Sequence, residues 1–161
     1  MTRGGSKSKG LNLAVFTPYR IAVLGHKMSE QLGAAYASED LTIPEWRVLA
    51  VVSQEPAVAA RDVVARTPMD KMAVSRAVSS LEKKGLISRG PAADRRVSAL
   101  SLSGKGKNVF DRISAIARAY EAKLTGAMTP ATRDGFFAAL DLLESAVKAA
   151  EDSDEKPRAA E

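Results

Sequence analysis

Between positions 70 and 85, apolar residues repeat with the spacing of an amphipathic helix. They fall at i, i+3, i+4 and i+7, which places them on one side of a helix: Val74, Ala77, Val78 and Leu81. The other side carries polar and basic residues: Lys71, Ser75, Arg76, Ser79 and Lys83. Asp70 stands at the expected start, and Gly85 suits a left-handed cap at the end. The pattern predicts a helix with one packed face and one face free to contact a partner.

A shorter helix is expected just before this one. Val63 and Val64 face inward between Arg61 and Arg66, and Pro68 cannot comfortably continue the helix. Two helices joined by a short turn make a helix-turn-helix.

A β-hairpin is expected after the second helix. Residues 86–88 predict one strand, and the alternation of Ser98, Leu100 and Leu102 predicts another. Residues 90–96 then form the loop between them. Two helices followed by a hairpin are typical of a winged helix-turn-helix, so the predicted fold class is mainly α with a small β-hairpin wing (α+β).

Further helices are expected on both sides of this core. Pro18 opens a helix over about 18–37, and Thr42 and Glu45 form a capping-box pair at the start of another. After the hairpin a long helix is marked by an apolar stripe: Val109, Ile113, Ile116, Tyr120 and Leu124. A last helix starts at Thr129-Pro130 and has a stripe of its own: Phe136, Leu140, Leu143 and Val147.

The last helix is too apolar for a fully exposed position. Phe137 and Leu142 lie on faces beside its stripe, so cover from more than one side is expected. A second copy of the chain would supply that cover. A purely intramolecular helical core is the alternative.

The composition is that of a globular protein without evident redox or metal chemistry. The 161 residues include 45% hydrophobic and 27% charged residues, enough for one domain with a real core. No apolar run approaches membrane-spanning length and the first residues lack a secretory signal, so we expect a cytoplasmic protein without membrane contact. With no Cys and one His, thiol-based sensing and a multi-His metal site are not expected, and no cofactor is predicted. An enzyme is not expected either, because a Gly-rich phosphate loop and an evident carboxylate pair are missing.

Charge is distributed unevenly along the chain, whose formal net charge is +5. Residues 60–107 contain eleven basic and four acidic residues, whereas residues 129–161 contain four basic and eight acidic ones. A basic run alone is usually a solvated face. Here it coincides with the helix-turn-helix pattern, which favours double-stranded DNA as the partner.

Several short segments together resemble the DNA-binding core of the MarR family of transcriptional regulators. They span roughly residues 41–106 in the family's order and spacing: Leu41-Thr42, Glu45-Trp46-Arg47-Val48-Leu49, Asp70-Lys71, Ser75-Arg76, Leu81 to Ile87, Arg89, Asp94-Arg95-Arg96, Leu102-Ser103 and Gly106. Two positions depart from the family pattern: Ala59-Ala60 lacks the usual Ser or Thr cap, and Ser103 replaces the usual Thr. Neither departure removes a group that would contact DNA.

The resemblance implies a homodimer whose N- and C-terminal helices form the dimer base. The implied segments are a single domain (13–150) with its winged helix-turn-helix core (about 41–106) and dimerisation helices (about 18–37 and 107–150). The composition of the two ends predicts a flexible basic tail before the domain (1–12) and a flexible acidic tail after it (151–161). Two recognition helices in successive major grooves imply an inverted repeat with half-sites about 10 bp apart.

The expected DNA contacts divide by role. Residues near the start of the recognition helix are placed to reach base edges: Lys71, Ser75, Arg76 and Ser79. Other basic residues are expected on phosphates: Arg89, Arg95, Lys105 and Lys107. At the wing tip, Arg96 is expected to enter the minor groove with Asp94 orienting it. The alternatives are that Arg76 pairs with Asp62 or Glu82, and that Asp94 and Arg96 form an exposed loop pair of little energetic value.

The resemblance also implies release from DNA by a small effector, an aromatic acid or an acyl-CoA thioester. Candidate effector-binding residues come from helices that should border the dimer base and the DNA-binding part: Tyr19, Arg20, His26, Trp46, Arg47 and Phe110. Trp46 could instead be a core residue and His26 a surface residue. The predicted function is a repressor that binds an operator; the alternative is an architectural winged-helix protein that binds DNA without sequence preference or ligand response.

Overall fold

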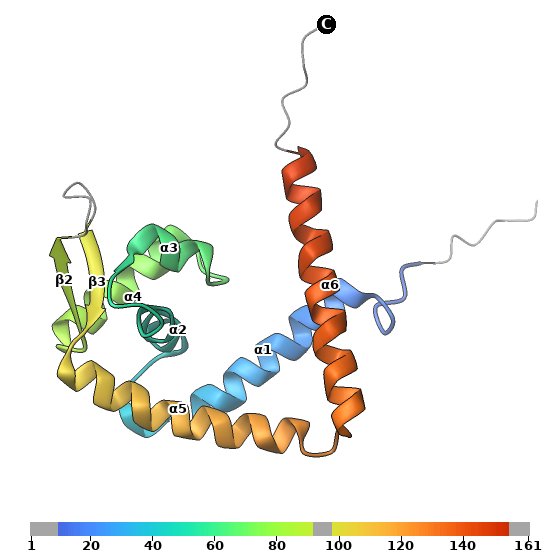
Figure 1. The fold of residues 1–161 in the computed structure, drawn as a ribbon, viewed down its shortest axis with the longest axis horizontal. Helices are drawn as coiled ribbons and strands as arrows, with labels where there is room; N and C mark the ends of the chain where they lie inside the picture. The colour runs from blue at the N-terminus through green and yellow to red at the C-terminus, as the bar shows by residue number, and fades with distance from the viewer. Residues whose placement is uncertain (1–9, 92–97, 155–161) are drawn as a thin grey trace, which may run out of the picture. The chain divides into compact units, whose positions relative to one another are not determined.

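The computed structural model describes residues 10–91 and 98–154 and is mainly helical, with one small antiparallel sheet (Figure 1). In chain order its elements are α1 (Thr17–Ala35), the 3₁₀ helix η1 (Ala37–Glu39), α2 (Ile43–Val52), β1 (Val58–Ala59), α3 (Ala60–Ala65), α4 (Lys71–Lys83), β2 (Ile87–Pro91), β3 (Ser98–Leu102), α5 (Gly104–Thr125) and α6 (Pro130–Asp154). The predicted fold class is confirmed: α3, α4 and the β2–β3 hairpin form a winged helix-turn-helix.

The ends of the helices follow from local side chains. The Thr42–Glu45 capping box is present at α2, and the Asp70 carboxylate accepts a hydrogen bond from the backbone amide of Ala73 at the start of α4 (2.7 Å). After α4, Gly85 has a φ of 69°, a conformation that costs a glycine little. Ser103 caps the start of α5, because its Oγ accepts a hydrogen bond from the Gly106 amide (2.9 Å).

The core of the first compact unit, Met1–Ala117, lies beneath α4. The largest side chains that are almost fully buried come from every layer of this unit: Tyr36, Leu49, Leu81, Leu100 and Ile113. Buried residues come from α2, α3, β3 and α5. The helix α4, which corresponds to the predicted recognition helix, therefore rests on a continuous apolar support.

The sheet contains a strand that the sequence pattern did not predict. Its strand order is β1-β3-β2, with Val58 opposite Leu100 on one side of β3 and Arg89 opposite Leu100 on the other. β1 has only two residues, too few for any periodicity, and it exists because β3 offers it a partner edge.

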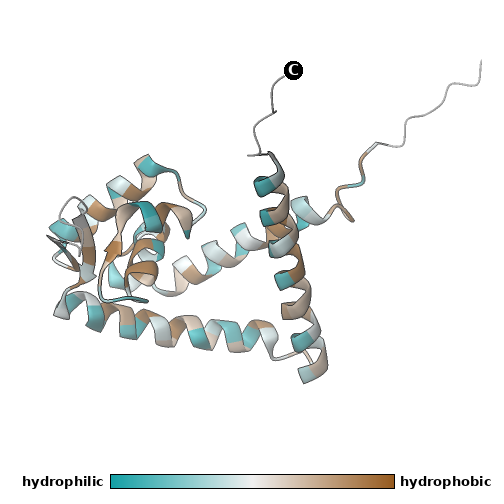
Figure 2. Ribbon diagram, turned by 45° about the horizontal axis from the view of Figure 1, so that its top comes forward, coloured by the Kyte–Doolittle hydropathy of each residue, from teal (hydrophilic) through white to brown (hydrophobic). Residues whose placement is uncertain are grey.

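The second compact unit, Arg118–Glu161, contains the end of α5 and α6. Along 130–153 every α6 residue except Leu140 is exposed, and apolar residues recur along this helix (Figure 2). Phe136 and Phe137 are each 43% exposed and Leu142 is 73% exposed. The helix continues to Asp154, four residues past the expected boundary at 150.

No helix within the part of the chain that the structure describes has the length and apolar character needed to cross a bilayer.

Replacing Gly106 with Ala tests the close approach of α5 to the end of α4. A Cβ at this position would overlap the backbone carbonyl of Leu86, so we expect Gly106→Ala to lower the free energy of unfolding by about 2–3 kcal/mol. Gly104→Ala is the matched control, because a Cβ there meets nothing within 4 Å. Urea unfolding at a fixed protein concentration measures both changes, and equal effects from the two variants would contradict the close contact.

Candidate nucleic-acid interface

The two faces of α4 differ as the sequence pattern predicts. Its apolar residues are buried: Val74, Ala77, Val78 and Leu81. The predicted base-reading residues are all exposed: Lys71, Ser75, Arg76 and Ser79. These four side chains are therefore brought together on one surface and can reach a partner without any rearrangement of the core.

The orientation of α4 is set by a buried carboxylate on α2. Glu45 is 3% exposed, and its oxygens accept hydrogen bonds from Ser80 Oγ on α4 (2.6 Å) and from the Thr42 backbone amide (2.7 Å). Lys84 Nζ, at the end of α4, lies 3.0 Å from Glu45 Oε1. One carboxylate thus joins the start of α2 to both the last turn and the end of α4.

These partners keep Glu45 ionised. Burial alone would raise its pKa, but the hydrogen bonds from Ser80, from the Thr42 amide, from Lys84 and from the Thr42 hydroxyl outweigh burial and lower the pKa below the ordinary 4.5. The sequence identified Glu45 only as a cap. Ser80 and Lys84 were missed as its partners, although their spacing of four residues places them on one side of α4.

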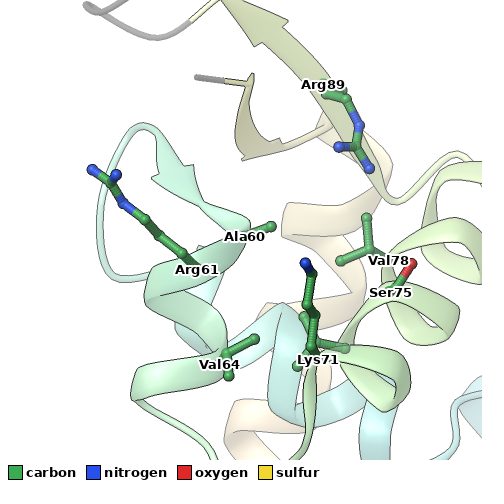
Figure 3. A pocket seen from close by; sticks show the side chains of 8 residues that line it. Ala60, Arg61, Val64, Lys71, Ser75, Val78 and Arg89 are labelled. Carbon is green, nitrogen blue, oxygen red and sulfur yellow. The ribbon is translucent and has the colours of Figure 1, made fainter. Parts of the chain in front are cut away.

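A groove of about 400 Å³ opens between α3, α4 and β2 (Figure 3). Its floor includes Ala60, Val64 and Val78, while Arg61 and Ser75 also line it. In Figure 3 the side chains of Lys71 and Arg89 reach toward this space from α4 and β2. The groove combines an apolar floor with basic groups, which suits a polyanion that approaches along α4.

Arg89 is attached to the recognition helix by a bidentate ion pair. Its Nε and Nη2 lie 3.0 and 3.3 Å from the two carboxylate oxygens of Glu82, and this hydrogen bonding raises the pKa of Arg89 above its ordinary value. The pair joins β2 to α4. It fixes the first strand of the hairpin beside the face that carries the base-reading candidates.

Arg76 makes no ion pair with Asp62 or Glu82 in the described part of the chain, so that alternative is wrong. Asp62 instead lies 3.7 Å from Arg61 Nε, and Glu82 is taken by Arg89. The guanidinium of Arg76 is left exposed on the face that carries the other base-reading candidates.

Of the other predicted phosphate contacts, the structure describes Lys105 and Lys107 but not Arg95. Lys105 donates a hydrogen bond to the Lys84 carbonyl (2.9 Å), and Lys107 pairs with Asp111 (2.8 Å); both lie at the exposed start of α5. The wing-tip candidates lie outside the described residues: Asp94, Arg95 and Arg96.

The candidate effector residues do not form one cluster. Trp46 stacks on Phe110 with 5.7 Å between ring centroids and lies 5.8 Å from the ring of Tyr36. Arg47, next to Trp46, donates a hydrogen bond to Ser29 on α1 (3.2 Å). Tyr36 was missed by sequence reasoning, because it lies in a connection between helices where no periodicity marks it.

The remaining effector candidates lie along α1. Tyr19 and Arg20 line a shallow groove of about 290 Å³ with Val23 and Leu24, and His26 forms an exposed pair with Glu30 (3.3 Å). Trp46 is half-buried and packs against the core, whereas the imidazole of His26 is 72% exposed. Trp46 and Phe110 are therefore brought together, while Tyr19, Arg20 and His26 are not part of that cluster.

The burial of Tyr36 has an electrostatic effect in this cluster. Desolvation raises the pKa of its phenol, and the nearby positive charge of Arg47 only partly opposes that change. Tyr36 therefore stays neutral across the physiological range and contributes a ring, not a charge, to the cluster.

Comparisons with known proteins agree with this geometry. A family model described as MarR family matches residues 39–97. The HTH-type transcriptional repressor Rv2887 of Mycobacterium tuberculosis is 23% identical over 128 residues, covering 79% of this chain and 92% of that protein.

Solved structures share the fold. A MarR/EmrR family transcriptional regulator from Acinetobacter sp. ADP1 has a TM-score of 0.79 and 26% identity, covering 86% of this chain and 99% of that one. MepR of S. aureus, solved as a complex with DNA, has a TM-score of 0.73 and 18% identity, covering 83% and 98% of the two chains.

Substitution of Glu45 tests whether the buried carboxylate supports the interface. Glu45→Ala leaves Ser80, Lys84 and the Thr42 amide without their acceptor, so we expect it to lower the free energy of unfolding by about 3 kcal/mol. Asp111→Ala, which removes the exposed pair with Lys107, is the control and should cost about 0.5 kcal/mol or less. Similar losses in urea unfolding would contradict the special role of Glu45.

The pH dependence of the Glu45 effect follows from its lowered pKa. A carboxyl whose pKa is lower in the folded state adds stability above its unfolded pKa and loses it as the pH falls through the folded pKa. Glu45→Gln resembles the protonated acid, so the stability gap between wild type and Glu45→Gln should be full at neutral pH and should shrink as the pH falls below 4.5. A gap that stays constant on acidification would show that the charge does not contribute.

Proposed function

The chain belongs to the MarR family of winged helix-turn-helix, DNA-binding transcriptional regulators, which are not enzymes, and we propose that it is a repressor that binds an inverted-repeat operator as a homodimer. A small aromatic acid or an acyl-CoA releases it from the operator. The observation that carries this proposal is the exposed face of α4, where Lys71, Ser75, Arg76 and Ser79 stand free of the core.

Base reading is assigned to the exposed face of α4. Arg76 is suited to a guanine edge because its guanidinium presents several donors in a fixed plane and is not engaged by Asp62 or Glu82. Ser75 and Ser79 lie one turn apart on the same face and are short enough to let the helix approach the bases closely. Lys71 precedes them at the start of the helix.

Phosphate contacts are assigned to basic residues that lie around the exposed face of α4. Arg89 remains about half exposed beside the groove even while paired with Glu82, which supports a phosphate contact at that edge of α4. Lys105 and Lys107 provide further positive charge at the start of α5. In the segment that connects Pro91 to Ser98, Arg95 takes a phosphate and Arg96 enters the minor groove with Asp94 orienting it.

Exposed apolar side chains on α1 and α6 support dimerisation through these helices. On α1, Ile21 is 47% and Leu24 is 55% exposed; on α6, Leu143 is 41% and Val147 is 60% exposed. Such side chains on long amphipathic helices are stabilised when a second copy covers them. Two-fold symmetry then presents two α4 helices to successive major grooves.

The stacked rings of Trp46 and Phe110 support an aromatic effector. They join α2 to α5, with Arg47 alongside to pair with a carboxylate. The α1 candidates, Tyr19, Arg20 and His26, lie outside this cluster in the structure, and in this proposal they contact the effector from α1. An effector that separates the two rings would disturb the support of α4.

Selection of genomic fragments by the purified protein tests the proposed function. At near-physiological salt we expect enrichment of an inverted repeat whose half-site centres lie about 10 bp apart, because the two recognition helices are related by symmetry. The retained fragments are sequenced and their affinity is compared with that of random DNA. A preference of roughly 10³-fold or more supports a specific repressor, whereas retention without a repeat would replace it by an architectural DNA-binding role.

Substitution of Arg76 tests base reading within that operator. We expect Arg76→Ala to weaken operator binding by about 10- to 100-fold, with a smaller loss on random DNA, because a base contact adds specificity. Fluorescence anisotropy at one salt concentration measures both affinities. Arg118→Ala, which removes an exposed charge on α5 outside the interface, is the control; equal losses on operator and random DNA would reassign Arg76 to a phosphate.

A further inference from the structure

One large apolar side chain lies exposed on the recognition helix. Met72 is 63% exposed, and it is the one large hydrophobic residue with such exposure in the described part of 41–117. The other exposed large hydrophobics lie on or before α1 and from Leu124 onward. Met72 also does not belong to the side chains that pack against the core. Packing in the core therefore does not account for its apolar character.

Met72 lies at the centre of the interface face of α4. Ser75, Arg76 and Ser79 follow it at i+3, i+4 and i+7, so all four share one stripe. With 3.6 residues per turn, this stripe is directly opposite the side marked by the buried Val74 and Leu81. Met72 is also the second residue of the helix, in the first turn, the part of a recognition helix that contacts base edges.

The surroundings of Met72 are polar and basic, which decides what can cover it. Its neighbours on the face are Lys71, Ser75, Arg76 and Ser79, and a single apolar side chain among them is not the extended patch that a protein partner would use. A partner with negative charges along its edges and an apolar group between them fits this arrangement better than a protein surface does. The major groove of DNA is such a surface, since the C5-methyl group of thymine is its apolar feature.

We propose that Met72 is a specificity-determining residue, which packs its side chain against the C5-methyl group of a thymine in each operator half-site. The unbranched thioether chain adapts its shape to the methyl group and excludes water from it. Ser75 and Ser79, the short residues of the stripe, leave room for this contact. The inference rests on the proposed function, because it requires α4 to lie in the major groove.

The test removes only the methyl group. In the operator found by fragment selection, each thymine of the half-site is replaced in turn by deoxyuridine, at symmetric positions in both halves. We expect wild-type protein to lose about 10-fold in affinity at one thymine, which is the effect of about one buried methyl group per half-site. Met72→Ala should bind the unmodified operator more weakly and show no further loss on that deoxyuridine operator.

Two further measurements show whether the loss comes from the thymine contact or from a general weakening of DNA binding. Met72→Leu keeps an apolar side chain and should retain most of the discrimination between thymine and deoxyuridine, and affinity for random DNA should be equal in all three proteins. If wild type binds the inverted repeat but no deoxyuridine position distinguishes it from Met72→Ala, the proposal for Met72 is overturned while the proposed function stands. If no inverted repeat is bound, both are overturned.

Discussion

The buried carboxylate of Glu45 is the interaction on which the DNA-binding part depends. Burying a carboxylate until it is 3% exposed costs much free energy unless the charge is paired and hydrogen-bonded, and here the partners come from the start of α2 and from α4. Apolar packing of Val74 and Leu81 holds α4 against the core but is non-directional. The directional bonds to Ser80 and Lys84 add a fixed anchor point, and with it they hold the candidate base-reading side chains of α4 in place.

A second set of contacts links this support to the long helix α5. Arg112 forms a bidentate pair with Glu39 of η1, at 2.9 and 2.6 Å, and Lys84 also donates a hydrogen bond to the carbonyl of neighbouring Asp40. Asp40 has a φ of 55°, unusual for a residue with a side chain. The short connection between α1 and α2 is thus held from two sides, by α5 and by the end of α4.

Local features of the interface were predictable, and long-range ones were not. Asp70 as a cap, Gly85 as a left-handed residue and the exposed face of α4 all follow from residues within a few positions of one another, where helical geometry is decisive. Strand β1 and the stacking of Trp46 depend on partners more than forty residues away along the chain, Leu100 for Val58 and Phe110 for Trp46, and Tyr36 joins that cluster through Trp46. Met72 was not predicted for a different reason: a single apolar residue on a polar helix face produces no periodic pattern.

The hydroxyl of Ser103 lies between the end of β3, the start of α5 and the turn that follows α4. It donates to the carbonyl of Gly85 at 2.7 Å and accepts from the amide of Gly106 at 2.9 Å, between the end of β3 and the first turn of α5. The first turn of α5, a helix of 22 residues, is therefore tied through one side chain to the residue that ends the turn after α4. A shift of the first turn of α5 would break or strain the hydrogen bond from Ser103 to Gly85, so the start of α5 and the turn that ends α4 are expected to keep a fixed geometry relative to each other.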